Sequence, residues 1–241
     1  MAIFEREDTY LSLLCQRDYT VAELAALLYI SEPTVRRDVQ ALKKKELVSC
    51  QRGTVKLRVR YADQRIPLSV RTTEASAAKE CIAAQAATHI KNNQVIFLDA
   101  STTAYHLLPH IQKRRGILLI TNGAKTALDA AAMGIKTICT GGEMTLESFS
   151  FVGADAESTL RRYNADVAFF SCRGITNDGY ITDNSVLENV IRRIMIDSAR
   201  ESYVLCDTSK RGKTYLNTLC HVNALSGLIA EVDDFLAEAA R

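Results

Sequence analysis

The sequence lacks the features that mark membrane, secreted and repeat proteins. It shows no signal peptide, and none of its apolar runs is long enough to span a bilayer. Internal repeats and low-complexity tracts are also absent. We therefore expect no membrane partner, and a chain of 241 residues favours two globular domains.

Metal-binding and disulfide patterns are lacking too. The seven cysteines are odd in number and form no Cys-x-x-Cys pair, which favours a reduced, cytoplasmic protein with mostly buried thiols. The four histidines are dispersed, and although His106 and His110 can share a helix face, no third ligand is close in the sequence. We expect neither a metal site nor a cofactor.

The chain carries little net charge overall, but positive charge is concentrated in one segment. The net charge is only +2. Between Pro33 and Arg60, nine lysine and arginine residues stand against two acidic residues, a net charge of +7, which leaves −5 for the rest of the chain. A basic segment on an acidic body is typical of a DNA-binding domain joined to another domain.

The segment from Ser31 to Lys45 carries the most informative pattern. Ser31 can cap a helix with its hydroxyl, and Pro33 suits the first turn, where no backbone N–H is needed. Helical spacing predicts a buried stripe made of Val35, Val39 and Leu42. The opposite face carries Arg36, Arg37 and Gln40. Guanidinium groups near a helix N-terminus are suited to phosphates and guanine edges.

The segment before it predicts a second short helix. Thr20 and Glu23 have the spacing of a capping box. The apolar residues that follow at helical spacing are Val21, Leu24, Ala25 and Leu28. Tyr29 and Ile30 form a short joint to Ser31. Two capped helices with a tight turn are typical of a helix-turn-helix, whose second helix reads the major groove of DNA. The alternative is an ordinary helical hairpin with solvated arginines.

The flanking segments complete a predicted winged helix. Residues 5–16 read as a first helix, and residues 47–50 and 54–59 read as two strands about a turn at Gly53. Arg52 at the tip of this wing would lie close to a phosphate backbone, although a plain surface hairpin is equally compatible with the residues. The polar, unperiodic residues 61–76 read as a linker.

From residue 77 onward, apolar runs alternate with helical patterns. The predicted strands are 95–99, 117–120, 137–140, 167–170, 203–206 and 228–229, and the predicted helices are 77–90, 102–111, 124–133, 154–163 and 186–199. This alternation indicates a mostly parallel sheet with helices on both faces, hence an α/β domain over residues 77–241. Ligands of such sheets bind at the carboxyl ends of the strands.

Polar and glycine-rich segments follow five of these strands. Asp99-Ala-Ser-Thr-Thr103 runs straight into a helix, an arrangement that can bind phosphate. The others are Thr121-Asn-Gly123, Thr140-Gly-Gly-Glu143, Ser171-Cys-Arg-Gly174 and Asp207-Thr-Ser-Lys210. Singly, each has a plainer explanation, since Asp99 or Ser101 can serve only as a helix cap and Lys210 as a solvated lysine. Together they predict a crevice for a phosphorylated sugar or polyol.

The chain resembles the DeoR family of transcriptional regulators over nearly its whole length. The motifs that carry the resemblance are Ser31-Glu-Pro-Thr-Val-Arg-Arg-Asp38, Asp99-Ala-Ser-Thr-Thr103, Thr121-Asn-Gly123, Thr140-Gly-Gly142, and Asp207-Thr-Ser-Lys210 with Gly212. The resemblance implies a winged helix-turn-helix DNA-binding domain (1–60), a linker (61–76) and a sensor domain (77–241). This sensor domain is similar to ribose-5-phosphate isomerase and CoA transferases and binds phosphorylated sugars as inducers.

The resemblance also implies which residues act. The expected DNA-binding residues are Ser31, Thr34, Arg36, Arg37, Gln40 and Arg52. The expected effector-binding residues are Asp99, Ser101, Thr102, Thr103, Asn122, Gly123, Arg173, Asp207 and Lys210. No catalytic residue is expected.

Three departures from the family pattern bear on these expectations. Cys50-Gln-Arg-Gly53 replaces the usual Arg-x-His-Gly-Gly of the wing. Ser101 stands where the family usually has glycine, so its side chain narrows the pocket or adds a hydroxyl. The usual final strand has no counterpart before Arg241, so we expect a shorter sheet edge or one completed by another subunit.

The sequence therefore favours a DNA-binding repressor of carbohydrate-metabolism genes, active as a dimer or tetramer on double-stranded operator DNA and modulated by a phosphorylated sugar or polyol. The alternative is a phosphosugar isomerase whose acid–base residues are Asp183, Glu188 and Lys210. Glu188 lies inside a predicted helix, where it can instead pair with Arg192. A third hypothesis is an RNA-binding module that uses the wing.

Overall fold

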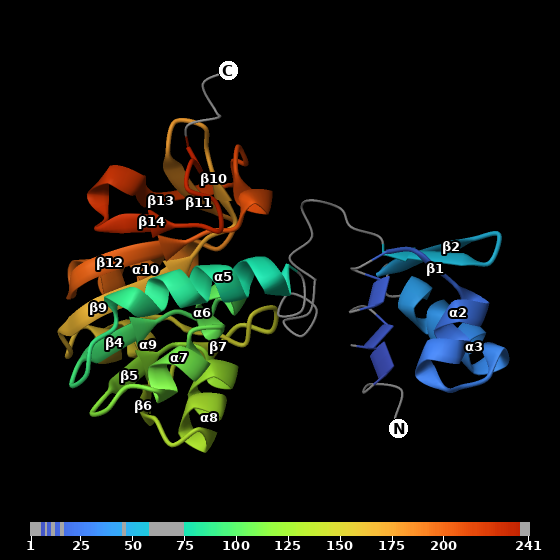
Figure 1. Cartoon of the computed structure of the whole chain (residues 1–241), viewed down its shortest axis with the longest axis horizontal. Helices are drawn as coiled ribbons and strands as arrows, with labels where there is room; N and C mark the ends of the chain where they lie inside the picture. Colours follow the sequence, from blue (N-terminus) through green and yellow to red (C-terminus); the bar gives the residue numbers. More distant parts are fainter. Residues whose placement is uncertain are drawn as a thin grey trace. The chain divides into compact units, whose positions relative to one another are not determined.

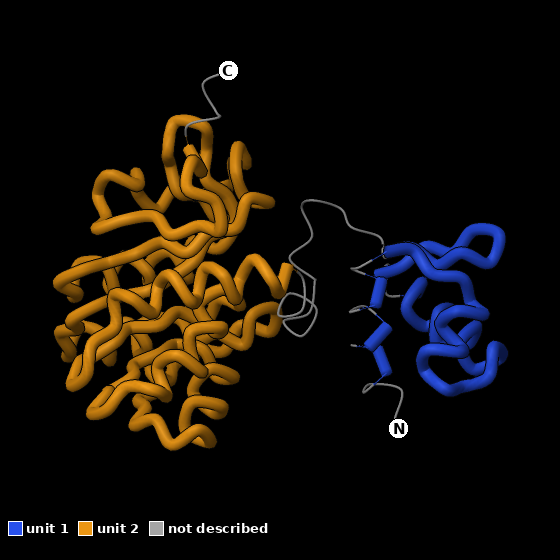
Figure 2. Tube along the Cα trace, viewed as in Figure 1, with its two compact units in different colours: residues 1–74 blue, residues 75–241 orange. Residues whose placement is uncertain are grey.

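The chain divides into two units, residues 1–74 and residues 75–241 (Figure 2). The computed structural model describes residues 6–7, 9–10, 13–14, 17–44, 47–57 and 75–236. The predicted linker, residues 61–76, therefore lies outside the described residues except for Ala75 and Ser76. Residues 237–241, where the family's usual final strand was expected to be missing, lie outside the described residues as well.

Two helices form the centre of the first unit (Figure 1). They are α2 (Val21–Leu28) and α3 (Glu32–Lys44), and residues 6–7, 9–10 and 13–14 are also helical. The predicted capping box is confirmed: the Thr20 hydroxyl accepts from the Glu23 N–H, and the Glu23 carboxylate accepts from the Thr20 N–H. Tyr29 ends α2 in the left-handed region at φ 53°, which turns the chain towards α3.

The apolar stripe predicted on α3 forms the core of this unit. Val35, Val39 and Leu42 are buried, together with Leu24 of α2 and Tyr10. The side of α3 that carries the polar residues is thereby left to solvent, as the spacing predicted.

The predicted wing is present as a hairpin of β2 (Val48–Gln51) and β3 (Thr54–Leu57). Arg52 and Gly53 make its two-residue turn with positive φ angles of 49° and 79°, the backbone of a type I′ hairpin turn. A short strand that the sequence did not predict, β1 (Tyr19–Thr20), pairs with β3, so the sheet order is β1-β3-β2. Residues 58–59 of the predicted second wing strand lie outside the described residues.

The second unit is built on a six-stranded parallel sheet in the order β14-β12-β9-β4-β5-β6. The strands are β4 (Val95–Leu98), β5 (Leu118–Thr121), β6 (Lys136–Cys139), β9 (Ala165–Ser171), β12 (Ala199–Leu205) and β14 (Gly227–Ile229). Because all six run the same way, their carboxyl ends lie at one edge of the sheet. No helix in the described ranges has the length and apolar character to cross a membrane.

Helices cover both faces of this sheet (Figure 1). One face packs against α5 (Ser76–Ala86), α6 (Thr102–Tyr105), α7 (Leu108–Gln112) and α8 (Ala124–Ala132), and the other packs against α9 (Ala154–Leu160) and α10 (Val186–Asp197). Alternate residues of β4 show the division, since Ile96 and Leu98 join the first cluster and Phe97 joins the second. The predicted α/β fold class is confirmed.

Some elements differ from the predicted pattern. The single helix predicted over residues 102–111 is two helices, α6 and α7, and Pro109 occupies the first turn of α7, where its missing N–H costs nothing. The helix predicted over residues 77–90 ends at Ala86 and continues as a 3₁₀ turn, Ala87–His89.

Several short antiparallel strands had no alternating pattern long enough to predict them. A second sheet is made of β10 (Gly174–Ile175), β11 (Tyr180–Asp183) and β13 (Asn217–His221), and a hairpin is made of β7 (Glu143–Met144) and β8 (Phe151–Val152). Asp183 of β11 and the loop between β7 and β8 contact the site described next.

Candidate functional site

The polar face of α3 carries five of the six residues predicted to contact DNA. Arg36, Arg37 and Gln40 are exposed side by side. Arg36 forms an exposed ion pair with Glu32, 3.0 Å long, which costs little to break. The Ser31 hydroxyl lies 2.9 Å from the Thr34 hydroxyl, while the Ser31 carbonyl accepts the first backbone bonds of α3. This face can approach a DNA groove without unfolding the helix.

A partly buried ion pair anchors the core-facing side of α3. Asp38 lies on the apolar face of α3, where its Oδ2 accepts from Arg6 Nε at 3.0 Å and from the Tyr10 hydroxyl at 3.4 Å. Burial and the Asp38 carboxylate raise the pKa of Tyr10, so the phenol remains a donor. Asp38 was not among the predicted site residues, although a charged residue three positions after Val35 is a signal for such a pair.

Arg52 lies at the tip of the wing, exposed and in the left-handed region. Its position at a two-residue turn projects the side chain away from the hairpin. The structure thus keeps Arg52 accessible to a phosphate backbone.

In the second unit, the loop after β4 is organised by Asp99. One carboxylate oxygen accepts from the Ser101 N–H at 3.1 Å and from the Ser101 hydroxyl at 2.5 Å. The other accepts from the Ser171 N–H at 3.3 Å and from Arg192 Nε at 3.0 Å. Ser101 also caps α6 by accepting from the Ala104 N–H. Asp99 therefore holds the loops after β4 and β9 together.

Arg192, on α10, binds three carboxylates in the interior. Its Nε meets Asp99, its Nη1 meets Asp183 at 2.9 Å, and its Nη2 meets Glu188 at 3.0 Å. Only 5% of Arg192 is exposed. Burial favours loss of the charge, but the three carboxylates outweigh it and raise the pKa of Arg192. The guanidinium is therefore permanently charged and fixed in place.

The second oxygen of Glu188 is bound by two serines of the loop between β7 and β8. The Ser150 hydroxyl donates to Glu188 Oε1 at 2.7 Å, and the Ser148 hydroxyl donates to the same oxygen. The two hydroxyls lie 2.8 Å from each other, and Thr145 contacts both. Both oxygens of Glu188 are thus engaged by the chain itself.

Lys210 links the loops after β9 and β12. Its ammonium group donates to the Ser171 hydroxyl at 2.8 Å and to the Thr103 hydroxyl at 3.3 Å, and pairs with Asp207 at 3.3 Å. Burial opposes the charges of Lys210 and Asp207, but their attraction prevails, so the pKa of Lys210 is raised and that of Asp207 is lowered. Both groups remain charged at neutral pH.

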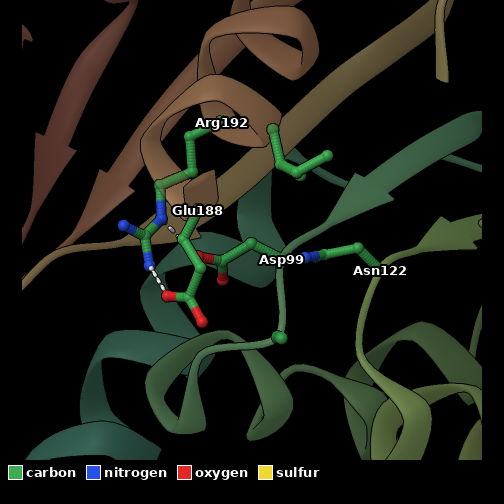
Figure 3. A pocket seen from close by; sticks show the side chains of 6 residues that line it. Asp99, Asn122, Glu188 and Arg192 are labelled. Carbon is green, nitrogen blue, oxygen red and sulfur yellow. Dashed lines mark hydrogen bonds and ion pairs between the residues drawn. The ribbon is translucent and has the colours of Figure 1, made fainter. Parts of the chain in front are cut away.

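A small cavity lies between these groups, beside Asn122 (Figure 3). It is partly open to solvent, contains about 150 Å³ of space free of protein atoms, and is nowhere wide enough for a water molecule; it is lined by Asp99, Ala100, Asn122, Glu188, Ile191 and Arg192. In Figure 3, Asn122 lies across the cavity from Glu188 and Arg192. The Asn122 Nδ2 donates to the Phe151 carbonyl at 3.1 Å, whereas its buried Oδ1 has no hydrogen-bond partner among the described residues.

The remaining predicted effector residues lie around the same network. Gly123 approaches Ala100 so closely that a Cβ on it would lie 3.0 Å from the Ala100 Cα. Thr102 is buried in the first turn of α6, and Arg173 lies 3.7 Å from Asp183 with its side chain 30% exposed. The loops after β4, β5, β9 and β12 therefore meet at one edge of the sheet, as their strand direction predicted.

The histidine pair noted in the sequence is a partly buried surface feature. His106 and His110 both contact Glu80 of α5, at 3.5 Å and 3.2 Å. Within the described ranges, no cluster of three or more histidine, cysteine or acidic side chains has an arrangement that would hold a metal ion.

Two family models match adjoining parts of the chain. One, described as a DeoR-like helix-turn-helix domain, matches residues 6–59, and the other, described as a DeoR C terminal sensor domain, matches residues 74–232. The chain belongs to the DeoR family. It is therefore a DNA-binding transcriptional regulator with a separate sensor domain.

Curated relatives of this DeoR-family protein are also transcriptional regulators. The uncharacterized regulator YulB of Bacillus subtilis is 29% identical, covering 96% of this chain and 90% of its own. The regulator GolR of Listeria innocua is 32% identical, covering 87% and 83%. The lactose phosphotransferase system repressor of Staphylococcus aureus is 26% identical, covering 88% and 85%.

Among solved structures, eIF2B delta from Chaetomium thermophilum has a similar fold, with a TM-score of 0.51 and 16% identity over 66% of this chain and 57% of that chain. Ribose 5-phosphate isomerase from Methanocaldococcus jannaschii aligns with a TM-score of 0.43 and 18% identity over 56% and 54%. The similarity to eIF2B delta concerns the fold alone.

Sequence reasoning missed the centre of the sensor-domain network. Arg192 was considered only as a partner of Glu188, and Asp183 only as part of an enzyme. The signal for Arg192 was its place on α10, because it shares the buried face of that helix with Ile191 and Met195. A cation on an apolar helix face requires buried carboxylates. The two serines of the β7–β8 loop carried no comparable signal.

Proposed function

We propose that this DeoR-family protein represses genes of carbohydrate metabolism and that a phosphorylated sugar or polyol, bound at the carboxyl edge of the sensor sheet, releases it from DNA. A dimer or higher oligomer would place two copies of α3 in successive major grooves. The observation that carries the proposal is the meeting of the four strand-end loops around Lys210, Asp99 and the adjoining cavity.

The exposed face of α3 supports the DNA-binding half of the proposal. Arg36 and Arg37 project from a helix whose opposite face is anchored in the core. Contacts to phosphates would supply most of the affinity, and these two side chains would read bases or set the helix in the groove. Ser31, Thr34, Gln40 and Arg52 are proposed as further DNA contacts.

The sensor-domain network supports the effector half. Lys210 donates to the hydroxyl of Thr103 in the first turn of α6 and pairs with Asp207, and a phosphate could replace the Asp207 carboxylate as the partner of Lys210. The cavity is closed to water-sized groups, so binding requires side chains to move. Such a movement is what a sensor needs to transmit a signal.

The names of relatives favour sugar control. The Staphylococcus aureus relative is named a lactose phosphotransferase system repressor, and a Haemophilus influenzae relative, 30% identical over 88% of this chain, is named an L-fucose operon activator. The first name favours repression, and both favour carbohydrate operons.

The structure offers the isomerase hypothesis less support. A general base needs a carboxylate oxygen within reach of the substrate proton, yet both oxygens of Glu188 are hydrogen-bonded within the chain. Turnover of ribose 5-phosphate that disappears in Glu188→Gln would establish an enzyme instead.

The proposal is tested by footprinting the protein on its own promoter and then screening phosphorylated sugars and polyols by thermal shift. A ligand raises stability by RT ln(1 + [L]/Kd), so a micromolar binder at millimolar concentration contributes about 4 kcal/mol. Competition by single-stranded RNA should be weak if duplex DNA is the target. A panel that neither shifts the melting temperature nor alters DNA binding would contradict effector control.

A further inference from the structure

The Glu188 carboxylate is bound in an unusual way for a residue at a ligand site. Two neutral hydroxyls, from Ser148 and Ser150, donate to a single oxygen, Oε1, while Arg192 fixes the other oxygen. Ser150 is fully buried and Ser148 is nearly so. Because O–H donors to a carboxylate make strong hydrogen bonds, this arrangement holds the acid without neutralising it.

The geometry of the two serines matches that of a polyol. Their hydroxyls lie 2.8 Å apart, a separation that neighbouring hydroxyls on a carbon chain can also adopt. Two adjacent ligand hydroxyls could therefore take their place on Glu188 Oε1 with little change at the carboxylate. Arg192 would not have to move, since it is held by Asp99 and Asp183 as well.

On the other side of the same cavity, the buried side-chain oxygen of Asn122 needs a hydrogen-bond donor. Asn122 is 2% exposed, and its Oδ1 accepts from no donor in the part of the chain that the structure describes. A buried acceptor without a donor is costly, and the Nδ2 is already fixed on the Phe151 carbonyl. Asn122 and Glu188 both line the cavity (Figure 3), so a group that enters there and carries a further O–H would satisfy Asn122.

We propose that the hydroxyls of Ser148 and Ser150 compete with two adjacent hydroxyls of a polyhydroxylated effector for the carboxylate of Glu188, and that a third effector hydroxyl donates to Asn122. This inference rests on the proposed function and adds the orientation of the ligand. The phosphate lies beside Lys210, and the carbon chain extends past Asp99 towards Glu188. The protein's own serines thereby set the concentration of effector needed for release.

The exchange involves only part of the β7–β8 loop. The Phe149 carbonyl accepts from the Ala124 N–H, and the Phe151 N–H donates to the Asn122 carbonyl, so this end of the loop is pinned to the segment after β5. Rotation of the Ser150 side chain and displacement of Ser148 would therefore suffice.

The test compares the full-length protein with the double variant Ser148→Ala, Ser150→Ala by titration calorimetry. The probes are D-glucitol 6-phosphate, ribitol 5-phosphate, D-ribose 5-phosphate and inorganic phosphate. If the serine-bound form outweighs the open form by ten to one, removal of the hydroxyls tightens the best organic probe about tenfold. Inorganic phosphate, which cannot reach Glu188, should change less than twofold. Ser158→Ala, at an exposed serine of α9, is the matched control and should leave every affinity unchanged.

A second variant keeps the test independent of loop folding. Glu188→Gln retains the shape but removes the charge, and we expect at least tenfold weaker binding of the organic probe with phosphate unaffected. Equal or weaker binding of the organic probe by the serine variant would overturn the inference while leaving the proposed function intact. If no sugar or polyol phosphate binds either protein, the proposed function fails and the inference fails with it.

Discussion

One guanidinium group contacts three carboxylates in the interior of the sensor domain and offsets part of their negative charge. Arg192 touches Asp99, Asp183 and Glu188, and its loss would leave these carboxylates unpaired in the interior. The Asp183 pKa shows the strength of the interaction: burial raises it, but Arg192 outweighs burial and holds it below the ordinary value.

Replacing Arg192 by Met should lower the free energy of unfolding of the sensor domain by about 3–5 kcal/mol, the typical cost of removing one member of a buried ion pair. Urea denaturation followed by circular dichroism measures this change in the free energy of unfolding. Arg200→Met is the control, because that side chain is exposed and its 3.7 Å pair with Asp166 should be worth about 1 kcal/mol or less. Equal effects of the two substitutions would show that the network does not stabilise the domain.

Arg36→Ala and Arg37→Ala should each abolish the preference for the promoter duplex over unrelated duplex. Each substitution removes a guanidinium from the face of α3 without touching its core. Gel-shift titrations with both duplexes measure the preference, and thermal shift with the best sugar phosphate should remain as in the unmodified protein. A preserved preference would mean that other side chains read the bases.

At the residue scale, sequence patterns predicted positions better than they predicted partners. The exposure of Arg36 and Arg37 followed from helical spacing, and the position of Lys210 at a strand end followed from its place after a strand. The buried pairing of Asp38 with Arg6 and the contact of Arg192 with Asp99 were missed because the partners lie 32 and 93 residues away along the chain. Such pairs depend on tertiary contacts that a local pattern does not contain.

In the wing, the effect of one substitution on folding can be measured apart from its effect on DNA binding. Its turn needs two residues in the left-handed region, and Arg52 occupies one of them at φ 49°. Arginine tolerates this conformation poorly, whereas asparagine favours it. Arginine at this position is thus consistent with a role in binding.

Arg52→Asn should keep the hairpin or stabilise it slightly while weakening DNA binding. If Arg52 meets one phosphate, the slope of log affinity against log salt should become shallower by about 0.9. Binding isotherms at several salt concentrations give the slope, and a melting curve checks the fold. An unchanged slope would show that the wing makes no contact through this residue.

Among the elements, those marked by continuous apolar runs or by a helical period were predictable. The six parallel strands and the helices between them followed from these patterns. The strands that form the second sheet and the β7–β8 hairpin did not, because they carry no continuous apolar run like those of β4 and β5. The prediction therefore lacked the sheet that places Asp183, at the end of β11, beside Arg192, and the hairpin whose loop carries the serines that bind Glu188.

At the scale of the whole molecule, the buried carboxylates should make the sensor domain sensitive to acid. The pKa values of Asp183 and Asp207 are lower in the folded protein than in the unfolded chain. They therefore stabilise the fold above the unfolded pKa of about 3.9, and this contribution is lost as pH falls through the folded values. Lys210, whose pKa is raised, contributes fully at neutral pH and loses its effect only in strong alkali.

Urea denaturation between pH 3 and pH 7 should show the unfolding free energy falling steeply below about pH 4. Asp183→Asn should be less stable at neutral pH, since Arg192 loses a partner, and should depend less on pH in the acid range. If the variant and the unmodified protein have parallel pH profiles, Asp183 is not a source of the acid sensitivity.

The central claim is that a reader of DNA is coupled to a sensor of a phosphorylated sugar or polyol. The most direct measurement is the affinity of the full-length protein for its own promoter duplex at one salt concentration, with and without a saturating sugar phosphate that thermal shift has shown to bind. A coupling free energy of about 1–3 kcal/mol predicts roughly 5–150-fold weaker DNA binding in its presence. An affinity that stays the same while the sugar phosphate is bound would contradict the account.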